Sequence, residues 1–291
     1  MQYEAMFPTE QINVLLSFGR TDQNKYGFFV THRTKVHSVT LDSGAYTLHC
    51  AARKPPDLTV ELYREYALEH GKYVDFLFNL DSDFSENGHY ETGINLYNQA
   101  FLEEVGLDPV PVIHDIYGSE ISDYINRKKH KMLAIGSSLL GDPTGIQIAI
   151  HNIHRAGIMV HLFGTTSFKL LATNPVSSCD ASTWHQAAAR GYILFWNPNG
   201  RGKSHTDQIQ FTKYSGPLPK ERIPFLEYEF RNDLSEHLQK TFGFEPSDLR
   251  GASGPSNRQV VNIHYFVELQ KRINAEHRKK GFFPNSGATL M

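Results

Sequence analysis

The chain has 291 residues, of which 40% are hydrophobic and 21% charged, so a large core can form and general disorder is excluded. A formal net charge of −2 argues against a protein that coats polyanions with its whole surface. The longest apolar runs, at residues 12–18 and 192–196, are far shorter than the roughly 20 residues of a membrane-spanning helix. The N-terminus lacks a basic stretch followed by an apolar one, so neither a secretory signal nor a membrane partner is expected.

The two cysteines, Cys50 and Cys179, are too few for a disulfide framework or a four-cysteine zinc site. One disulfide between them stays open, but a reducing cytoplasm is the simpler interpretation. We therefore expect a cytoplasmic protein.

Short apolar runs alternate with amphipathic stretches over the first two-thirds of the chain. The apolar runs are rich in Val, Ile, Leu and Phe and lack regular polar alternation, which is typical of strands buried on both faces. They predict strands at residues 12–18, 36–41, 73–80, 109–114, 131–136, 157–164, 175–180 and 192–196.

Helical spacing of apolar residues marks the stretches between these strands. It predicts helices at residues 58–71, 91–106, 119–130, 144–157 and 166–173. Strands that alternate with helices indicate a parallel sheet with right-handed crossovers. Eight strands in this order favour an α/β fold of the (β/α)8 TIM-like barrel type. An open doubly wound sheet is the alternative, but no G-x-G-x-x-G follows the first strand.

The last part of the chain differs in character from the rest. Residues 200–291 contain 14 Lys and Arg against 10 Asp and Glu, a net charge of +4. Their longest patterns, at residues 223–244 and 258–280, predict helices. We expect a catalytic barrel at residues 1–199 and a mildly basic, mainly helical extension at 200–291 that packs on it.

Polar residues follow many of the predicted strands, at the end where the sites of parallel barrels lie. An Asp in this position is often only the N-cap of the next helix. After Asp42, however, Gly44 lets a substrate approach the backbone, and Asp180 follows an unusually small and polar strand end. Together Asp42 and Asp180 suggest chemistry with two carboxylates, one attacking an anomeric carbon and the other moving protons. The polar residues at strand ends are Asp42, Ser43, Asp81, Asp83, His114, Asp115, Gly136, Ser137, Cys179 and Asp180.

At these residues the chain resembles the tRNA-guanine transglycosylase superfamily, most closely its phage and genomic-island branch that inserts 7-deazaguanines into DNA. The resemblance covers roughly residues 36–196. The segment "LDSGAY" resembles the motif whose aspartate is the general acid and base, which maps to Asp42. The most specific match is "VHLFGTTSFKLLATNPVSSCDASTW", which places the nucleophile at Asp180.

The resemblance also implies a base-binding site. "FLFNLDSD" resembles the strand whose aspartate reads the guanine edge, here Asp81, and "PVPVIHD" gives His114 a binding role. "LAIGSSLLG" resembles the strand whose backbone contacts the base, here at Gly136 and Ser137. The expected substrate-binding set is Ser43, Gly44, Asp81, His114, Gly136, Ser137 and Trp184.

Aromatic residues near these motifs are candidates for stacking on a nucleotide that has left its duplex. They are Tyr46, Phe84 and Trp184, although packing is the commoner role of aromatic residues at a barrel rim.

The chain departs from the tRNA enzymes at their zinc site, a C-x-C-x-x-C motif plus a His after the nucleophile strand. No cysteine follows Cys179, so we expect neither zinc nor another cofactor, and the basic C-terminal region takes the place of the zinc subdomain. His151 and His154 lie three apart on a predicted helix but lack a third ligand at a recognisable spacing. We interpret them as part of a partly exposed helix face.

The first hypothesis is therefore a DNA-guanine transglycosylase, a glycosyltransferase whose partners are DNA and a 7-deazaguanine such as 7-cyano-7-deazaguanine. It would act in the cytoplasm, or in the host cytoplasm if a phage encodes it. The alternatives are a tRNA- or nucleoside-directed base-exchange enzyme and a catalytically silent nucleic-acid-binding subunit. A partner protein or a homo-oligomer stays open.

Overall fold

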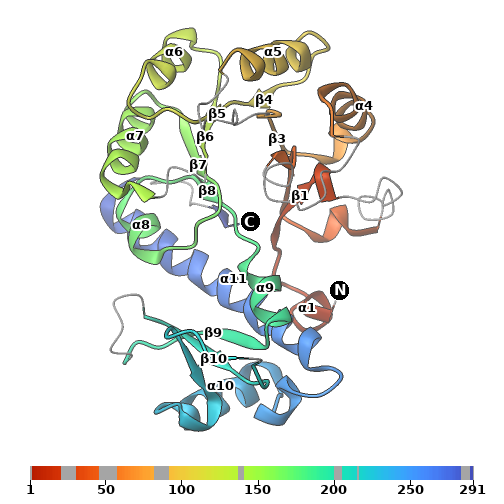
Figure 1. Ribbon diagram of the computed structural model, residues 1–291, viewed down its shortest axis with the longest axis vertical. Helices are drawn as coiled ribbons and strands as arrows, with labels where there is room; N and C mark the ends of the chain where they lie inside the picture. Colours follow the sequence, from red (N-terminus) through yellow and green to blue (C-terminus); the bar gives the residue numbers. More distant parts are fainter. Residues whose placement is uncertain are drawn as a thin grey trace.

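The computed structural model describes residues 2–20, 31–45, 58–81, 92–136, 141–199, 205–214, 216–282 and 289–290. It shows the expected α/β fold, with parallel strands on the inside and helices around them (Figure 1). In these ranges no helix is both long and apolar enough to cross a membrane.

Nine of the described strands form two all-parallel sheets. The two sheets are connected where β4 of one sheet leads directly into β5 of the other. One sheet has the order β1-β2-β3-β4 and the other the order β12-β8-β7-β6-β5. Pro111 separates β4 from β5, and because proline has no N–H to donate, the ladder breaks there while the chain runs on. The strands are β1 (Asn13–Ser17), β2 (Ser38–Asp42), β3 (Phe76–Phe78), β4 (Pro109–Val110), β5 (Val112–Ile113), β6 (Met132–Ile135), β7 (Met159–Leu162), β8 (Ser178–Cys179) and β12 (Thr289–Leu290).

Helices alternate with these strands and lie outside them in Figure 1, as the sequence predicts. Side chains cap three of the helices: Thr59, Asp142 and Ser167 each accept a hydrogen bond from the backbone N–H three residues further on. Such caps satisfy N–H groups that the first helical turn leaves without partners. The helices are α4 (Val60–His70), α5 (Thr92–Glu103), α6 (Glu120–Arg127), α7 (Pro143–Arg155) and α8 (Phe168–Thr173).

Residues 192–196 form a strand, but not beside β8 as the predicted eighth barrel strand would. This strand, β9 (Tyr192–Trp196), pairs antiparallel with β10 (Thr206–Gln210), which pairs in parallel with β11 (Arg222–Pro224). A connection of nine residues lets β10 return directly along β9, whereas a parallel partner needs a longer crossover. The C-terminal strand β12 instead occupies the place next to β8.

The C-terminal extension is therefore not only helical, because β10 and β11 belong to it. The ladder between β9 and β10 also crosses the expected boundary between residues 199 and 200. The helices outside the βα units are α1 (Gln2–Met6), α9 (Thr183–Ala189), α10 (Arg231–Phe242) and α11 (Gly254–Lys280).

Helix α11 joins the two parts of the molecule and crosses between them in Figure 1. Near its middle, Tyr265 and Leu269 pack into the same apolar core as the strands β6 to β8 and helix α7. Nearer its start, Val260 and Val261 belong to a second core formed with β9, β10 and α10. One helix therefore contributes to both cores.

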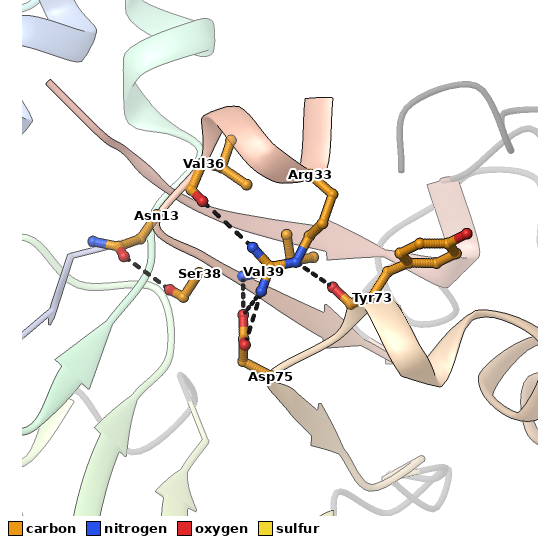
Figure 2. A network of polar contacts seen from close by, with 7 residues as sticks. All are labelled: Asn13, Arg33, Val36, Ser38, Val39, Tyr73 and Asp75. Carbon is orange, nitrogen blue, oxygen red and sulfur yellow. Dashed lines mark hydrogen bonds and ion pairs between the residues drawn. The ribbon is translucent and has the colours of Figure 1, made fainter. Parts of the chain in front are cut away.

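Polar contacts fix the amino ends of β1, β2 and β3 (Figure 2). The Arg33 guanidinium donates to both Asp75 oxygens, at 2.8 and 2.9 Å. The same carboxylate accepts the Val39 N–H at 2.8 Å, and the Ser38 hydroxyl donates to Asn13 Oδ1 at 2.8 Å. These contacts tie the three strands together at the edge opposite their carboxyl ends.

A substitution of Asn262 tests how much its hydrogen bonds contribute to the packing of α11 against β9 and α9. Its buried side chain accepts the Leu194 N–H at 2.8 Å and donates to the Trp184 carbonyl at 3.2 Å. We expect Asn262→Leu to lower the free energy of unfolding by about 2–4 kcal/mol, because it leaves buried backbone groups without partners. Urea unfolding measures this. The exposed Asn152→Leu on α7 is the control, and an equal loss in both variants would contradict the prediction.

Candidate functional site

Three aspartates that follow parallel strands form the centre of the candidate site. Asp42 ends β2, Asp81 follows β3 and Asp180 follows β8. The Ser43 hydroxyl lies 3.5 Å from Asp81 Oδ1, and the charges of both Asp81 and Asp180 act on Asp42. Because β2 and β8 belong to different sheets, the interaction between Asp42 and Asp180 requires the two sheets to curve toward one another at the carboxyl ends of their strands.

Asp42 has an unusual affinity for protons. Burial, and then the negative charges of Asp81 and Asp180, raise its pKa from 3.8 to about 7. The Gly44 N–H, 3.1 Å from Asp42 Oδ2, and a hydrogen bond from Ser17 act in the opposite direction but do not cancel the rise. A carboxyl group with a pKa near neutrality both donates and accepts protons readily at physiological pH.

The backbone conformation and the close packing at residue 44 require a glycine there. Its φ is +84°, and a Cβ there would lie 2.5 Å from the backbone nitrogen of Gly19. The turn after β2 and the chain after β1 therefore touch backbone to backbone, and this contact holds the Asp42 turn in place.

Asp81 is paired with His114. The Nε2 atom of His114 lies 3.1 Å from Asp81 Oδ2, and the imidazole is almost fully buried. Glu120 accepts the backbone N–H of His114 at 2.9 Å, and a Cβ on Gly136 would lie 3.1 Å from the His114 ring. His114 is therefore connected to the site by its contact with Asp81. The ring of His114 has room beside residue 136 because glycine has no side chain.

Asp180 remains partly open to solvent, with 19% of its side chain exposed. Its Oδ1 accepts the Gly164 N–H at 3.0 Å and lies 3.5 Å from Nε2 of His161. Its neighbour Cys179 is buried, and burial raises the pKa of the thiol well above its usual value. Asp180 is therefore the accessible side chain at this strand end, and Cys179 is not.

The sequence motifs assigned no role to His161, although the structure places it at the site. It is fully buried on β7, in register with Ser178 on β8. The available signal was a histidine inside the apolar run "MVHL", where an imidazole needs polar partners.

Other candidates lie elsewhere or cannot be placed. Trp184 is on α9, where the centroid of its ring lies 5.5 Å from that of His185. His151 and His154 both contact the ring of Phe282, at 6.3 and 6.4 Å between centroids. The candidates that fall outside the described residues are Tyr46, Asp83, Phe84 and Ser137.

Within the described ranges, no three His, Cys, Asp or Glu side chains are grouped in a way that would hold a metal ion. Comparison with known families finds no family model that matches the chain. Comparison with curated protein sequences likewise finds no match.

The Gly44 contact gives a first test of the site. We expect Gly44→Ala to lower the free energy of unfolding by about 3 kcal/mol or more, since a positive φ and a backbone clash act together. Gly106→Ala is the matched control, because Gly106 has a φ of +85° and open space around its Cβ position. Its cost should be only about 1–2 kcal/mol. Equal costs in denaturant unfolding would contradict the close approach.

The raised pKa of Asp42 gives a second test. Because the folded protein binds this proton more tightly than the unfolded chain, ionised Asp42 costs stability above about pH 7, and the cost disappears below 3.8. Asp42→Asn is expected to be more stable than the wild type at pH 8.5, on the order of 2 kcal/mol, and to lose this advantage as pH falls toward 4. Urea midpoints across this range measure the difference. The exposed Asp108→Asn should show no such trend, and a pH-independent difference for Asp42→Asn would refute the assignment.

Proposed function

We propose that this protein is a DNA-guanine transglycosylase that exchanges guanine for a 7-deazaguanine, such as 7-cyano-7-deazaguanine. The observation that carries the proposal is the coupling of Asp42, whose pKa is about 7, to the partly exposed Asp180. One carboxyl group suited to proton transfer and one ionised carboxylate open to solvent are what glycosyl exchange by a covalent intermediate requires. The resemblance of residues 36–196 to the tRNA-guanine transglycosylase superfamily supports the same assignment.

The exchange has two balanced halves. In the first, Asp180 bonds to C1′ of the target nucleotide, the bond from C1′ to guanine breaks, and Asp42 gives its proton to the departing base. In the second, Asp42 takes a proton from the incoming 7-deazaguanine, whose nitrogen bonds to C1′ and releases the Asp180 carboxylate. Both halves pass through a sugar with cationic character, which negative charge at Asp180 stabilises.

Asp81 has a different task in this proposal. Its carboxylate, oriented by His114, accepts hydrogen bonds from the edge of the guanine base. Ser43 and the backbone at Gly136 would also contact the base.

The proposed architecture is a TIM-like barrel in which β4 and β5 together count as one strand, so that β1 to β8 supply seven strands and β12 the eighth. The electrostatic influence of Asp180 on Asp42 supports this curvature, because it links strand ends from the two sheets. In the same proposal the enzyme works in the cytoplasm without zinc, since no cysteine follows Cys179, and the C-terminal region contacts DNA.

Trapping the covalent adduct tests the proposal. The protein is incubated with duplex DNA, single-stranded DNA or tRNA, each with and without 7-cyano-7-deazaguanine, and then resolved on denaturing gels. Asp180→Asn should form no adduct, because an amide is a poor nucleophile. Asp42→Asn should bind the polymer but release base about 10²- to 10⁴-fold more slowly.

Asp81→Ala should retain the adduct but lose selectivity for guanine by about 1–3 kcal/mol, because donors on the base edge lose their acceptor. Asp108→Asn, an exposed aspartate immediately before β4, is the matched control and should behave as the wild type. An adduct that persists in Asp180→Asn would overturn the nucleophile assignment. A wild-type adduct on tRNA alone would redirect the proposal to the tRNA enzymes, and no adduct with any polymer would favour a silent binding subunit.

A further inference from the structure

A chain of three side chains links the interior to the accessible carboxylate of Asp180. The Ser178 hydroxyl lies 2.8 Å from Nδ1 of His161, and Nε2 of the same ring lies 3.5 Å from Asp180 Oδ1. The imidazole is fully buried and packs against the rings of Phe78 and Phe163, whose centroids lie 4.6 Å from its own and 4.6 Å from each other. The ring thus packs against two aromatic side chains while each of its nitrogens faces a polar group.

The polar ends fix the protons on the ring. A carboxylate only accepts hydrogen bonds, so a contact between Nε2 and Asp180 requires the proton to be on Nε2. In the neutral imidazole Nδ1 is then an acceptor, to which the Ser178 hydroxyl donates at 2.8 Å. In the described part of the chain Nε2 makes no hydrogen bond, and the carboxylate oxygen that faces it is Asp180 Oδ1, 3.5 Å away. A separation of 3.5 Å is long for a hydrogen bond, and such contacts often tighten when substrate binds.

The same three residue types act in serine hydrolases, but the exposure here is reversed. Ser178 is only 2% exposed, whereas 19% of the Asp180 side chain is exposed. A nucleophile has to reach its substrate, so the hydroxyl is the supporting end of this chain and the carboxylate is the reacting end.

We propose that His161 is a positioning residue that selects the attacking atom of Asp180. The Gly164 N–H and His161 Nε2 both approach Oδ1, at 3.0 and 3.5 Å, so Oδ1 is held by the protein and Oδ2 is the oxygen that bonds to C1′. Holding one oxygen also fixes the plane of the carboxylate, and a misplacement of about 1 Å can slow a reaction on the order of 10²-fold. This inference rests on the proposed function.

Two variants of His161 separate positioning from simple packing. His161→Leu fills much of the space without a donor, whereas the amide nitrogen of His161→Gln can occupy the place of Nε2. We expect His161→Leu to form the covalent adduct on the order of 10²-fold more slowly with unchanged KM for the polymer, and His161→Gln to recover to within about tenfold of the wild type. His154→Gln, at a partly buried position on α7, is the matched control and should keep the wild-type rate.

The outcomes distinguish this inference from the function on which it rests. A wild-type adduct together with an undiminished rate in His161→Leu overturns the positioning role alone, and so does an equal loss in both His161 variants. No adduct in the wild type overturns the proposed function and, with it, the role of His161. If His161→Leu does not fold, Ser178→Ala takes its place, with a smaller loss of rate expected and an unchanged rate contradicting the inference.

Nitrogen NMR tests the contact without any activity. In protein labelled with 15N at histidine, the spectrum of His161→Gln identifies the His161 signals. We expect a protonated Nε2 and an unprotonated Nδ1 in the wild type, with the Nε2 signal shifting in Asp180→Asn but not in Asp108→Asn. The opposite tautomer, or an Nε2 signal that does not shift in Asp180→Asn, would overturn the inferred contacts of His161.

Discussion

The parallel direction of the inner strands is the constraint on which the candidate site depends. Every crossover returns the chain to the same edge, so residues that follow β2, β3 and β8 meet although more than a hundred positions separate the first from the last. Three carboxylates brought together in this way repel one another. Burial and then this repulsion raise the pKa of Asp42, and the raised pKa suits that group to proton transfer.

Each of the three carboxylates has different surroundings, and in the proposed function each has a different role. Asp42 is raised in pKa by burial and by its two neighbouring carboxylates, while the N–H of Gly44 gives it a hydrogen bond. The imidazoles of His114 and His161 face Asp81 and Asp180 respectively. Neighbouring groups with different surroundings take different roles in acid–base chemistry, even when all are the same residue type.

Helix α11 links this site to the rest of the molecule. It packs on the parallel strands at one end and on the β9–β10 sheet at the other, so the two parts share a rigid element rather than a linker. The proposed contact of DNA with the C-terminal region would therefore be held in a fixed relation to the strand ends.

Local apolar periodicity and short motifs are enough to predict the alternation of strands and helices and the aspartates at the strand ends. The sequence by itself did not determine the partner of residues 192–196, since an apolar run shows that a strand is buried but not which strand lies beside it. Nor did it reveal that β12 takes the place next to β8, because such pairing joins residues far apart in the chain. Only the tertiary structure placed His161 against Asp180, since that contact depends on the register of β7 with β8. The raised pKa of Asp42 likewise depends on the tertiary structure, because it arises first from burial and then from charges on separate strands that only folding brings together.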